Sequence, residues 1–313
     1  MPITQPNRHV AAIDMGTNTF NLLIIRNNNQ CVPELILSTK EGVALGMGGI
    51  NENTISPEAW RRGMDCLTRF KAICDQYNCQ SIKAIGTSSI RNADNGIDFV
   101  REVETKLLIP CQIINGDEEA DMIYKGVCLT HHFEDKGLIM DIGGGSSEFI
   151  FADKDGVIKK NSFEIGVSRI YQQFEFSDPF SQLDIAKLFA YFETQTFGFF
   201  DEIQCDDFIG SSGSFETLYE LLHDKLFPLG FETVELTRNE MEVMIDFIMR
   251  MTLKEREKHH RILPIRRKML PIAAIKIKWV LNKINASRVI ITPCSLKEGL
   301  AFDLLNNICN LEE

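Results

Sequence analysis

Apolar and polar positions along the chain predict short buried strands separated by longer amphipathic helices. The runs GLIMDIG (137–143) and SEFIFAD (147–153) are rich in apolar residues, as expected of two neighbouring buried strands joined by a hairpin. The first long stretch with helical periodicity extends from about Pro57 to Tyr77. Strands that alternate with helices in this way predict an α/β fold class.

The same alternation continues through the rest of the chain. A hairpin of two strands is expected at 12–24, and further strands at 34–40, 81–87, 111–115, across 138–166, at 207–213 and at 288–293. Further helices are expected at 96–108, 116–127, 181–196, 214–222, across 239–283 and at 295–305.

An internal repeat divides the chain into two related halves. AIDMGTNTFNLLI (12–24) resembles IMDIGGGSSEFIF (139–151), at a spacing of 127 residues. We therefore predict domains at 1–127 and 128–313, with the last helix packing back on the first domain, and two hairpin loops that face each other across an interdomain cleft. The repeat aligns Asp14 with Asp141, Gly16 with Gly143, and Asn21 with Glu148.

Composition indicates a soluble globular protein. The 313 residues are 44% hydrophobic and 25% charged, and no apolar run approaches the ~20 residues that span a bilayer. The N-terminal residues lack a signal-peptide core, so a cytoplasmic location without membrane association is expected. Nine cysteines without a CxxC pair favour reduced thiols over a zinc site.

The net charge of −11 disfavours binding to nucleic acid, but the charge is unevenly distributed. Residues 250–283 hold eleven Lys or Arg residues and two acidic residues. This tract indicates a confined track for a polyanion, with a solvated helix face as the alternative. The cluster Arg266, Arg267 and Lys268 lies between two prolines, which argues against a plain helix surface there.

The octamer DIGGGSSE (141–148) carries the clearest chemical signal. Three consecutive glycines expose the backbone, and such a hairpin tip can point N–H groups at an anion. Asp141 and Glu148 are hard oxygen ligands suited to Mg²⁺. The octamer therefore predicts a phosphate and metal site, with a tight hairpin followed by an acidic residue as the alternative.

Three further segments contain candidate site residues. The turn at 207–218 has the exposed N–H groups of an anion site, although capping by Ser212 or Ser214 would also explain it. Arg91 follows a predicted strand and can bind phosphate or lie on the surface. Three acidic residues at 118–121 suit a helix start, and one of them can hold a water and take its proton.

The order of these motifs resembles the Ppx/GppA family of exopolyphosphatases and guanosine pentaphosphate phosphohydrolases. The resemblance extends from AAIDMGTNTFNLLI through EGVALGMGG, GTSSIRNADN, INGDEEADMIYKGV, LIMDIGGGSSEF, SFEIGVSRI and FIGSSGSFETL to SLKEGLAFDLL. It implies a duplicated, ribonuclease H-like fold of the actin, Hsp70 and sugar-kinase type, in a short two-domain form. It also makes a homodimer plausible.

The resemblance assigns roles to residues of this sequence. Glu119 matches the general base, and Asp141 and Glu148 match the positions that hold Mg²⁺. The phosphate-binding positions are Gly16, Thr17, Asn18, Arg91, Gly143, Gly144, Gly145 and Ser146, with the further loop around Ser212 and Gly213.

Three positions depart from the family pattern. Asn21 stands where an arginine is common, and Ala44 stands where an arginine often occurs. Arg266, Arg267 and Lys268 replace a frequent Arg-Ala-Asp triplet.

These residues predict hydrolysis of a terminal phosphoanhydride, with inorganic polyphosphate as the main candidate substrate and guanosine pentaphosphate as the close alternative. A non-catalytic sensor of polyphosphate or guanosine alarmones, and an ATP-dependent kinase or ATPase of the same superfold, remain open. The sequence does not give chain-length preference, oligomeric state or preferred metal.

Overall fold

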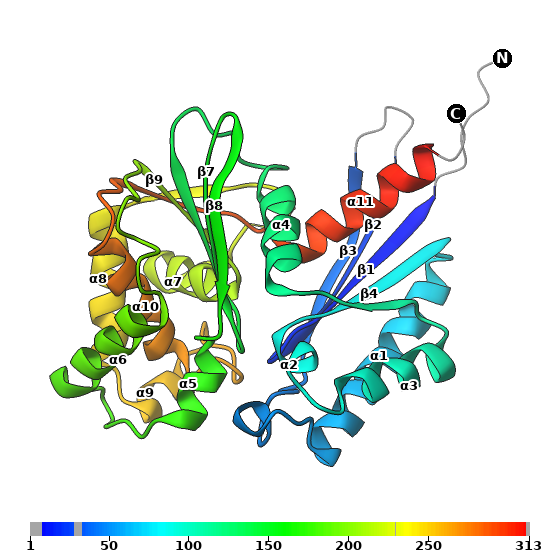
Figure 1. Ribbon diagram of the computed structural model, residues 1–313, viewed down its shortest axis with the longest axis horizontal. Coiled ribbons are helices and arrows are strands. Elements are labelled where there is room, and N and C mark those ends of the chain that lie inside the picture. Colours follow the sequence, from blue (N-terminus) through cyan, green and yellow to red (C-terminus); the bar gives the residue numbers. More distant parts are fainter. Residues whose placement is uncertain (1–7, 28–32, 229, 311–313) are drawn as a thin grey trace. The chain divides into compact units, whose positions relative to one another are not determined.

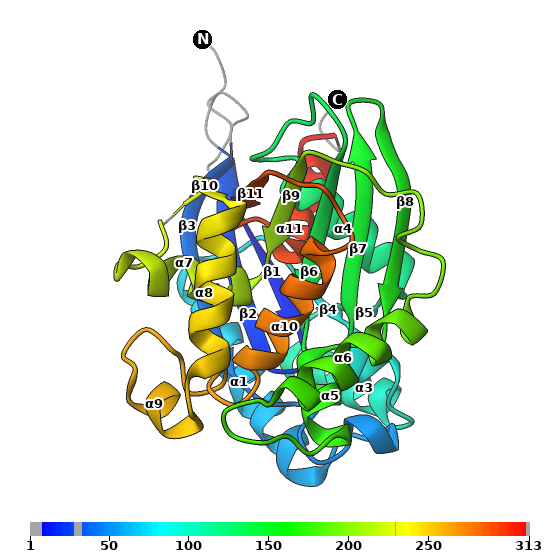
Figure 2. The same cartoon turned by 90° about the vertical axis from the view of Figure 1, so that its left-hand side faces the viewer.

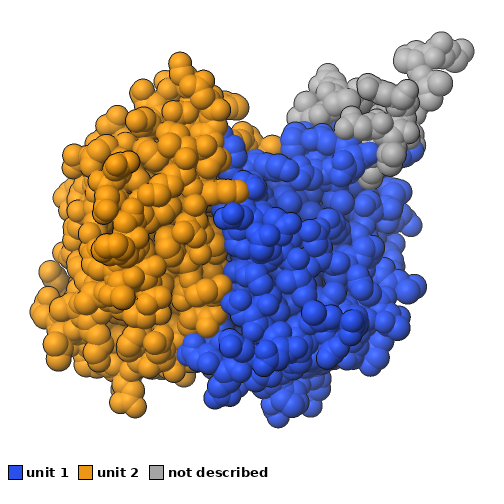
Figure 3. All heavy atoms as spheres, in the orientation of Figure 1, with its two compact units in different colours: residues 1–126, 295–313 blue, residues 127–294 orange. Residues whose placement is uncertain are grey.

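The computed structural model describes residues 8–27, 33–228 and 230–310, with side chains described up to residue 307. The chain forms two compact units, residues 1–126 with 295–313 and residues 127–294, which Figure 3 shows in blue and orange. Each unit is built around one sheet. The α/β class predicted from the sequence is confirmed.

The first unit contains a five-stranded sheet in the order β3-β2-β1-β4-β5. Its strands are β1 (His9–Met15), β2 (Thr19–Asn27), β3 (Pro33–Gly42), β4 (Ser81–Gly86) and β5 (Cys111–Ile113). Its helices are η1 (Ile50–Glu52), α1 (Pro57–Gln76), α2 (Ser88–Arg91), α3 (Gly96–Leu107), α4 (Gly116–Val127) and α11 (Leu296–Asn310).

Both faces of this sheet are covered, which explains why its central strands are so apolar. Alternate residues of β1 (Ala11, Ile13 and Met15) join one core with residues of α1 and α3. Helix α11 packs on β1 and β2, as Figure 1 shows. It packs closely against α4 at two glycines, Gly126 and Gly299. A Cβ on Gly126 would lie 2.0 Å from the Ser295 carbonyl oxygen. The last helix therefore belongs to the first unit.

The second unit contains a six-stranded sheet in the order β10-β11-β9-β6-β7-β8. Helix α10 lies against α5, α6, α7 and α8, as Figure 2 shows in part, and is buried along nearly its whole length. The strands are β6 (Gly137–Ile142), β7 (Ser147–Asp153), β8 (Gly156–Phe163), β9 (Asp207–Ser211), β10 (Val234–Thr237) and β11 (Arg288–Ile291). The helices are α5 (Val167–Gln173), α6 (Gln182–Gln195), α7 (Gly213–His223), α8 (Arg238–Arg250), α9 (Leu253–Lys258) and α10 (Leu270–Leu281).

The two sheets repeat one topology. In each, the first strand pairs antiparallel with the second and parallel with the fourth, and β6 to β9 correspond to β1 to β4. Asp14 lies opposite Asn21 as Asp141 lies opposite Glu148. The register shift between Ile24 and Ile25 recurs between Phe151 and Ala152, again 127 residues later. The duplication predicted from the sequence is therefore present in the backbone.

Some expected elements differ from the structure. The predicted helical region 239–283 is interrupted after α9, and residues 259–269 form turns before α10 begins. Two prolines, Pro264 and Pro271, limit helical continuity here. Strand β10 and helix α5 were not anticipated, because four- and seven-residue segments carry too little periodicity to be recognised.

Seven cysteines are free thiols, whereas Cys31 and the Cys309 side chain lie outside the described part; the seven are Cys66, Cys74, Cys79, Cys111, Cys128, Cys205 and Cys294. Within the described ranges, no helix has the length and apolar character needed to cross a bilayer.

Candidate active site

The carbonyl groups of the hairpin between β6 and β7 accept hydrogen bonds from the segment that follows β8. Gly143, Gly144 and Gly145 accept hydrogen bonds from the N–H groups of residues 166–169, at 2.8–3.2 Å. The N–H groups of Gly144, Gly145 and Ser146 donate to no acceptor in the part of the chain that the structure describes. An N–H group needs an acceptor, so this tip is suited to an anion such as phosphate.

Two buried carboxylates flank this hairpin. Asp141 and Glu148 lie directly opposite each other on β6 and β7, 8% and 1% exposed. Ser211 donates to Asp141 Oδ2 at 2.8 Å, and Ser162 donates to Glu148 Oε1 at 2.7 Å. These hydroxyl groups hold the carboxylates in place.

This donor set fits Mg²⁺, which takes one or two carboxylates and completes its shell with water and phosphoryl oxygens. Among the described residues, no group of three or more His, Cys, Asp and Glu side chains is arranged to bind a metal. That Asp141 and Glu148 hold Mg²⁺ stays a prediction.

The turn between β9 and α7 contacts the hairpin between β6 and β7. Ser212 has φ +87°, a costly conformation for a residue with a Cβ, and its hydroxyl accepts from Ile142 N at 3.4 Å. It makes no capping bond to α7, so the capping alternative is wrong for Ser212. A Cβ on Gly213 would lie 1.5 Å from Arg266 Nη2. Gly213 is thus needed for the close approach of the Arg266 guanidinium.

The first hairpin repeats this arrangement in the other unit. Gly46 N donates to the Thr17 carbonyl at 3.1 Å, and Val43 and Ala44 donate to that of Asn18 at 2.9 and 2.8 Å. The segment after the third strand therefore holds the loop carbonyls, as 166–169 does in the second unit. A Cβ on Gly16 would meet the Thr19 oxygen at 2.9 Å, and one on Gly143 would meet the Ser146 oxygen at the same distance.

The departures from the family pattern have local structural roles. Asn21 Nδ2 donates to Asp14 Oδ2 at 2.9 Å, across the paired strands. Ala44 adopts φ +49°, and Arg62 of α1 binds its carbonyl and that of Val43 at 2.9 and 2.7 Å. An arginine from another element thus supports this turn.

The acidic start of α4 contains two different roles. Glu118 forms a capping pair, because it accepts from Asn115 N at 2.8 Å while its own N–H donates to Asn115 Oδ1. Glu119 is buried, at 7% exposure, and pairs with Arg91 Nη1 at 2.7 Å. The helix start explains Glu118, whereas Glu119 is a buried acid held by an arginine. This difference singles out Glu119 as the candidate base.

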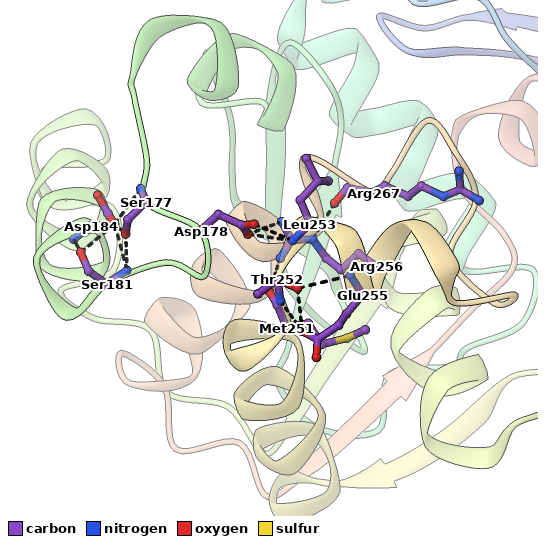
Figure 4. Close-up of polar contacts among 10 residues, drawn as sticks. All are labelled: Ser177, Asp178, Ser181, Asp184, Met251, Thr252, Leu253, Glu255, Arg256 and Arg267. Carbon is purple, nitrogen blue, oxygen red and sulfur yellow. Dashed lines mark hydrogen bonds and ion pairs between the residues drawn. The ribbon is translucent and has the colours of Figure 1, made fainter.

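The residues of the predicted polyanion cluster have different surroundings. Arg266 turns inward and binds Thr217 Oγ1 at 2.7 Å, whereas Lys268 is exposed and lies over the Tyr171 ring, with Nζ 5.9 Å from its centroid. Arg256, which is 3% exposed, fixes the backbone of this cluster, because its guanidinium donates to the Arg267 carbonyl at 2.7 Å (Figure 4). The Arg266 and Lys268 side chains therefore have different surroundings, and a polyanion track over the three residues stays a prediction.

The structure assembles the candidate residues into one group in each unit. Residues 16–18, Arg91 and Glu119 lie beyond the carboxyl ends of β1, β4 and β5, where α/β sheets bind ligands. The second group comprises Asp141, Gly143, Gly144, Gly145, Ser146, Glu148, Ser212, Gly213 and Arg266. That the two loops face each other across a cleft stays a prediction.

Sequence reasoning missed two residues that contact the second group. Ser211, which binds Asp141, lies in a quoted motif but carries no signal of its own. Arg169 Nε donates to the Gly145 carbonyl at 3.2 Å, and Arg169 also pairs with Glu164 at 2.7 Å. Its place in the SFEIGVSRI segment was the available clue.

Comparison with known proteins places these features in one family. A match to the Ppx/GppA phosphatase family covers residues 23–308. The chain belongs to this family. The crystal structure of an exopolyphosphatase from Cytophaga hutchinsonii is 31% identical and superimposes with a TM-score of 0.91, covering 96% of this chain and 98% of that one. The fold expected from the resemblance is thereby confirmed.

Relatives with curated names differ in length. A putative exopolyphosphatase of Haemophilus influenzae is 30% identical over 233 residues, which is 73% of this chain and 71% of the relative. A guanosine-5'-triphosphate,3'-diphosphate pyrophosphatase of Vibrio campbellii is 33% identical over 218 residues, 68% of this chain. That match spans only 43% of the Vibrio protein. Relatives with both kinds of name are therefore similar to this chain.

Proposed function

We propose that this protein hydrolyses the terminal phosphoanhydride bond of inorganic polyphosphate and releases orthophosphate. The observation that carries the proposal is the similarity to the Cytophaga exopolyphosphatase along almost the full length of both chains. The chemistry of the described residues agrees, because the second hairpin offers N–H donors beside two carboxylates. Polyphosphate is a repeating anion that such donors can bind without shape-specific contacts.

In the proposed mechanism, the backbone N–H groups of Gly144, Gly145 and Ser146 bind oxygens of the terminal phosphoryl group. Asp141 and Glu148 would hold Mg²⁺, which neutralises phosphate charge when it is bound. Glu119 orients a water molecule and accepts its proton as the oxygen attacks phosphorus in line with the leaving group. Arg91 fixes the Glu119 carboxylate through their 2.7 Å ion pair. Positioning and electrostatics thus supply the rate enhancement.

Guanosine pentaphosphate is the second candidate substrate. The similarity to the Vibrio pyrophosphatase favours it, and it presents the same kind of terminal phosphoanhydride. A base-specific pocket would be needed in addition, and polyphosphate does not require one. We therefore rank polyphosphate first.

One assay tests the proposal. Orthophosphate release is measured from long-chain polyphosphate, guanosine pentaphosphate and ATP, each with and without Mg²⁺. We expect Mg²⁺-dependent release that is fastest from polyphosphate. Faster release from guanosine pentaphosphate would select the second candidate, and tight binding of polyphosphate without release would indicate a sensor. Light scattering on the same samples tests the homodimer.

A further inference from the structure

A lysine is buried in the most apolar helix of the second unit. Helix α10 has the sequence LPIAAIKIKWVL, and Lys276 within it is 0% exposed, like its neighbours Ile275 and Ile277. Its Nζ lies 5.6 Å from the centre of the Phe192 ring. Burying an amine in apolar surroundings is costly, so the hydrogen bonds that it makes there need an explanation.

Those hydrogen bonds reach the end of the second glycine loop and the start of the segment that supports it. Lys276 Nζ donates to Ser147 Oγ at 2.8 Å and to the Ile165 carbonyl. Ser147 follows the loop directly as the first residue of β7. Ile165 precedes the segment 166–169, whose N–H groups bind the loop carbonyls. One side chain therefore connects the end of the loop with the start of the segment that supports it.

The connection ends next to the loop at Ser147 and next to the supporting segment at Ile165. Gly166 packs so closely that a Cβ there would lie 2.2 Å from the Gly144 carbonyl oxygen, and its N–H donates to Gly145 at 3.0 Å. A displacement of Ile165 would therefore be transmitted to the loop backbone. Likewise, a displacement of Ser147 would move Ser146, whose N–H belongs to the proposed phosphate site.

An apolar residue would fill the position of Lys276 without the desolvation cost of a buried amine. Burial lowers the pKa of Lys276 to about 7, and the nearby Glu148 carboxylate partly opposes this change. Both protonation states can keep the connection, because a neutral amine still has two N–H groups and one lone pair for a carbonyl and a hydroxyl. The connection is thus a matter of geometry and does not depend on titration. Buried polar groups of this kind can be retained because they specify one arrangement.

We propose that Lys276 is a positioning residue for phosphoanhydride hydrolysis, which joins Ser147 to Ile165 and so keeps the loop 143–146 in its phosphate-binding conformation. The inference rests on the proposed function for its catalytic part only. Nothing in the joint Ser147–Lys276–Ile165 geometry requires substrate, so the structural part can be tested on the free protein.

The experiment compares Lys276→Met with a matched control, Lys278→Met. Lys278 lies two residues away on α10, is 34% exposed and pairs with Asp246 at 2.7 Å. Hydrogen–deuterium exchange is followed in peptides covering 140–150 and 163–170 of the free full-length protein. We expect at least ~10-fold faster exchange in Lys276→Met in these peptides, because fewer hydrogen bonds hold their backbone, and wild-type exchange in Lys278→Met.

Kinetics supply the second measurement. For orthophosphate release from tripolyphosphate with Mg²⁺, Lys276→Met is expected to lower kcat by about 10–100-fold with a smaller change in KM, because a misplaced loop loses transition-state geometry. Ser147→Ala removes one partner and should give a milder form of both effects. The double variant should resemble Lys276→Met, since both changes break the same connection.

The outcomes separate the two proposals. Wild-type exchange in the loop peptides of Lys276→Met, or an unchanged kcat, overturns the positioning role. If the wild-type protein releases no phosphate, the proposed function fails while exchange still decides whether Lys276 holds the loop. If Lys276→Met does not fold, Ser147→Ala takes its place, and unchanged exchange in that variant overturns the inference.

Discussion

Replacement of Gly166 by alanine tests the backbone arrangement behind the second glycine loop. Gly166 has φ −60°, which alanine adopts without strain, so any effect must come from the space around the new methyl group. That methyl would lie 2.2 Å from the Gly144 carbonyl oxygen and 2.3 Å from the carbonyl carbons of Gly144 and Gly145. The segment has to move by about 1 Å before such contacts become ordinary.

The expected cost follows from the bonds that this movement strains. Overpacking costs about 1–3 kcal/mol, and weakening of the hydrogen bonds from residues 166–169 adds about 1 kcal/mol or more. We therefore expect the free energy of unfolding to fall by about 2–5 kcal/mol, with a Tm lower by roughly 5–15 °C. A loop displaced by about 1 Å should also lose about 100-fold in kcat/KM.

Calorimetry and phosphate release measure the two effects. Gly156→Ala is the control, because Gly156 has φ +125° in the β7–β8 turn and a Cβ there would meet nothing within 4 Å. The control should lose about 1–3 kcal/mol through backbone strain and keep its activity. Wild-type stability and activity in Gly166→Ala would refute the close approach of this segment to the loop.

Further predictions concern the carboxylates. Glu119→Gln keeps the shape of the side chain but removes its basicity, so phosphate release should fall by ~10²–10⁴-fold. The control Glu118→Gln, on the same helix, should lose stability alone. Equal activities of the two variants would show that Glu119 is not the general base. Asp141→Asn should raise the Mg²⁺ concentration needed for half-maximal activity at least ~10-fold, and an unchanged titration would remove Asp141 from the metal site. Although burial opposes it, hydrogen bonds from Ser177 and Ser181 lower the pKa of Asp184 to about 2, as Figure 4 illustrates. Because this pKa is depressed, the stabilisation is present above the unfolded value near 4 and disappears as the pH falls towards 2. Urea unfolding should therefore show a deficit for Asp184→Asn at pH 7 that shrinks below pH 4, and a deficit independent of pH would contradict this explanation.

The sequence by itself determined the fold class, the duplication and the glycine loops. Strand and hairpin patterns depend on neighbours along the chain, so the repeat could be found at Asp14 and Asp141 without any structure. The order of the motifs also identified the family. Boundaries of strongly periodic elements were predicted closely, such as α1, which ends one residue before the expected Tyr77.

Tertiary structure alone decided which residues of similar appearance have different partners. Glu118 and Glu119 are adjacent and identical in type, but one caps α4 and the other pairs with Arg91, 28 residues away. Lys276 looked like one charge of a basic tract, yet it is buried and binds Ser147, 129 residues away. Such contacts depend on which helix faces which strand, and the local periodicity of the sequence does not specify that packing.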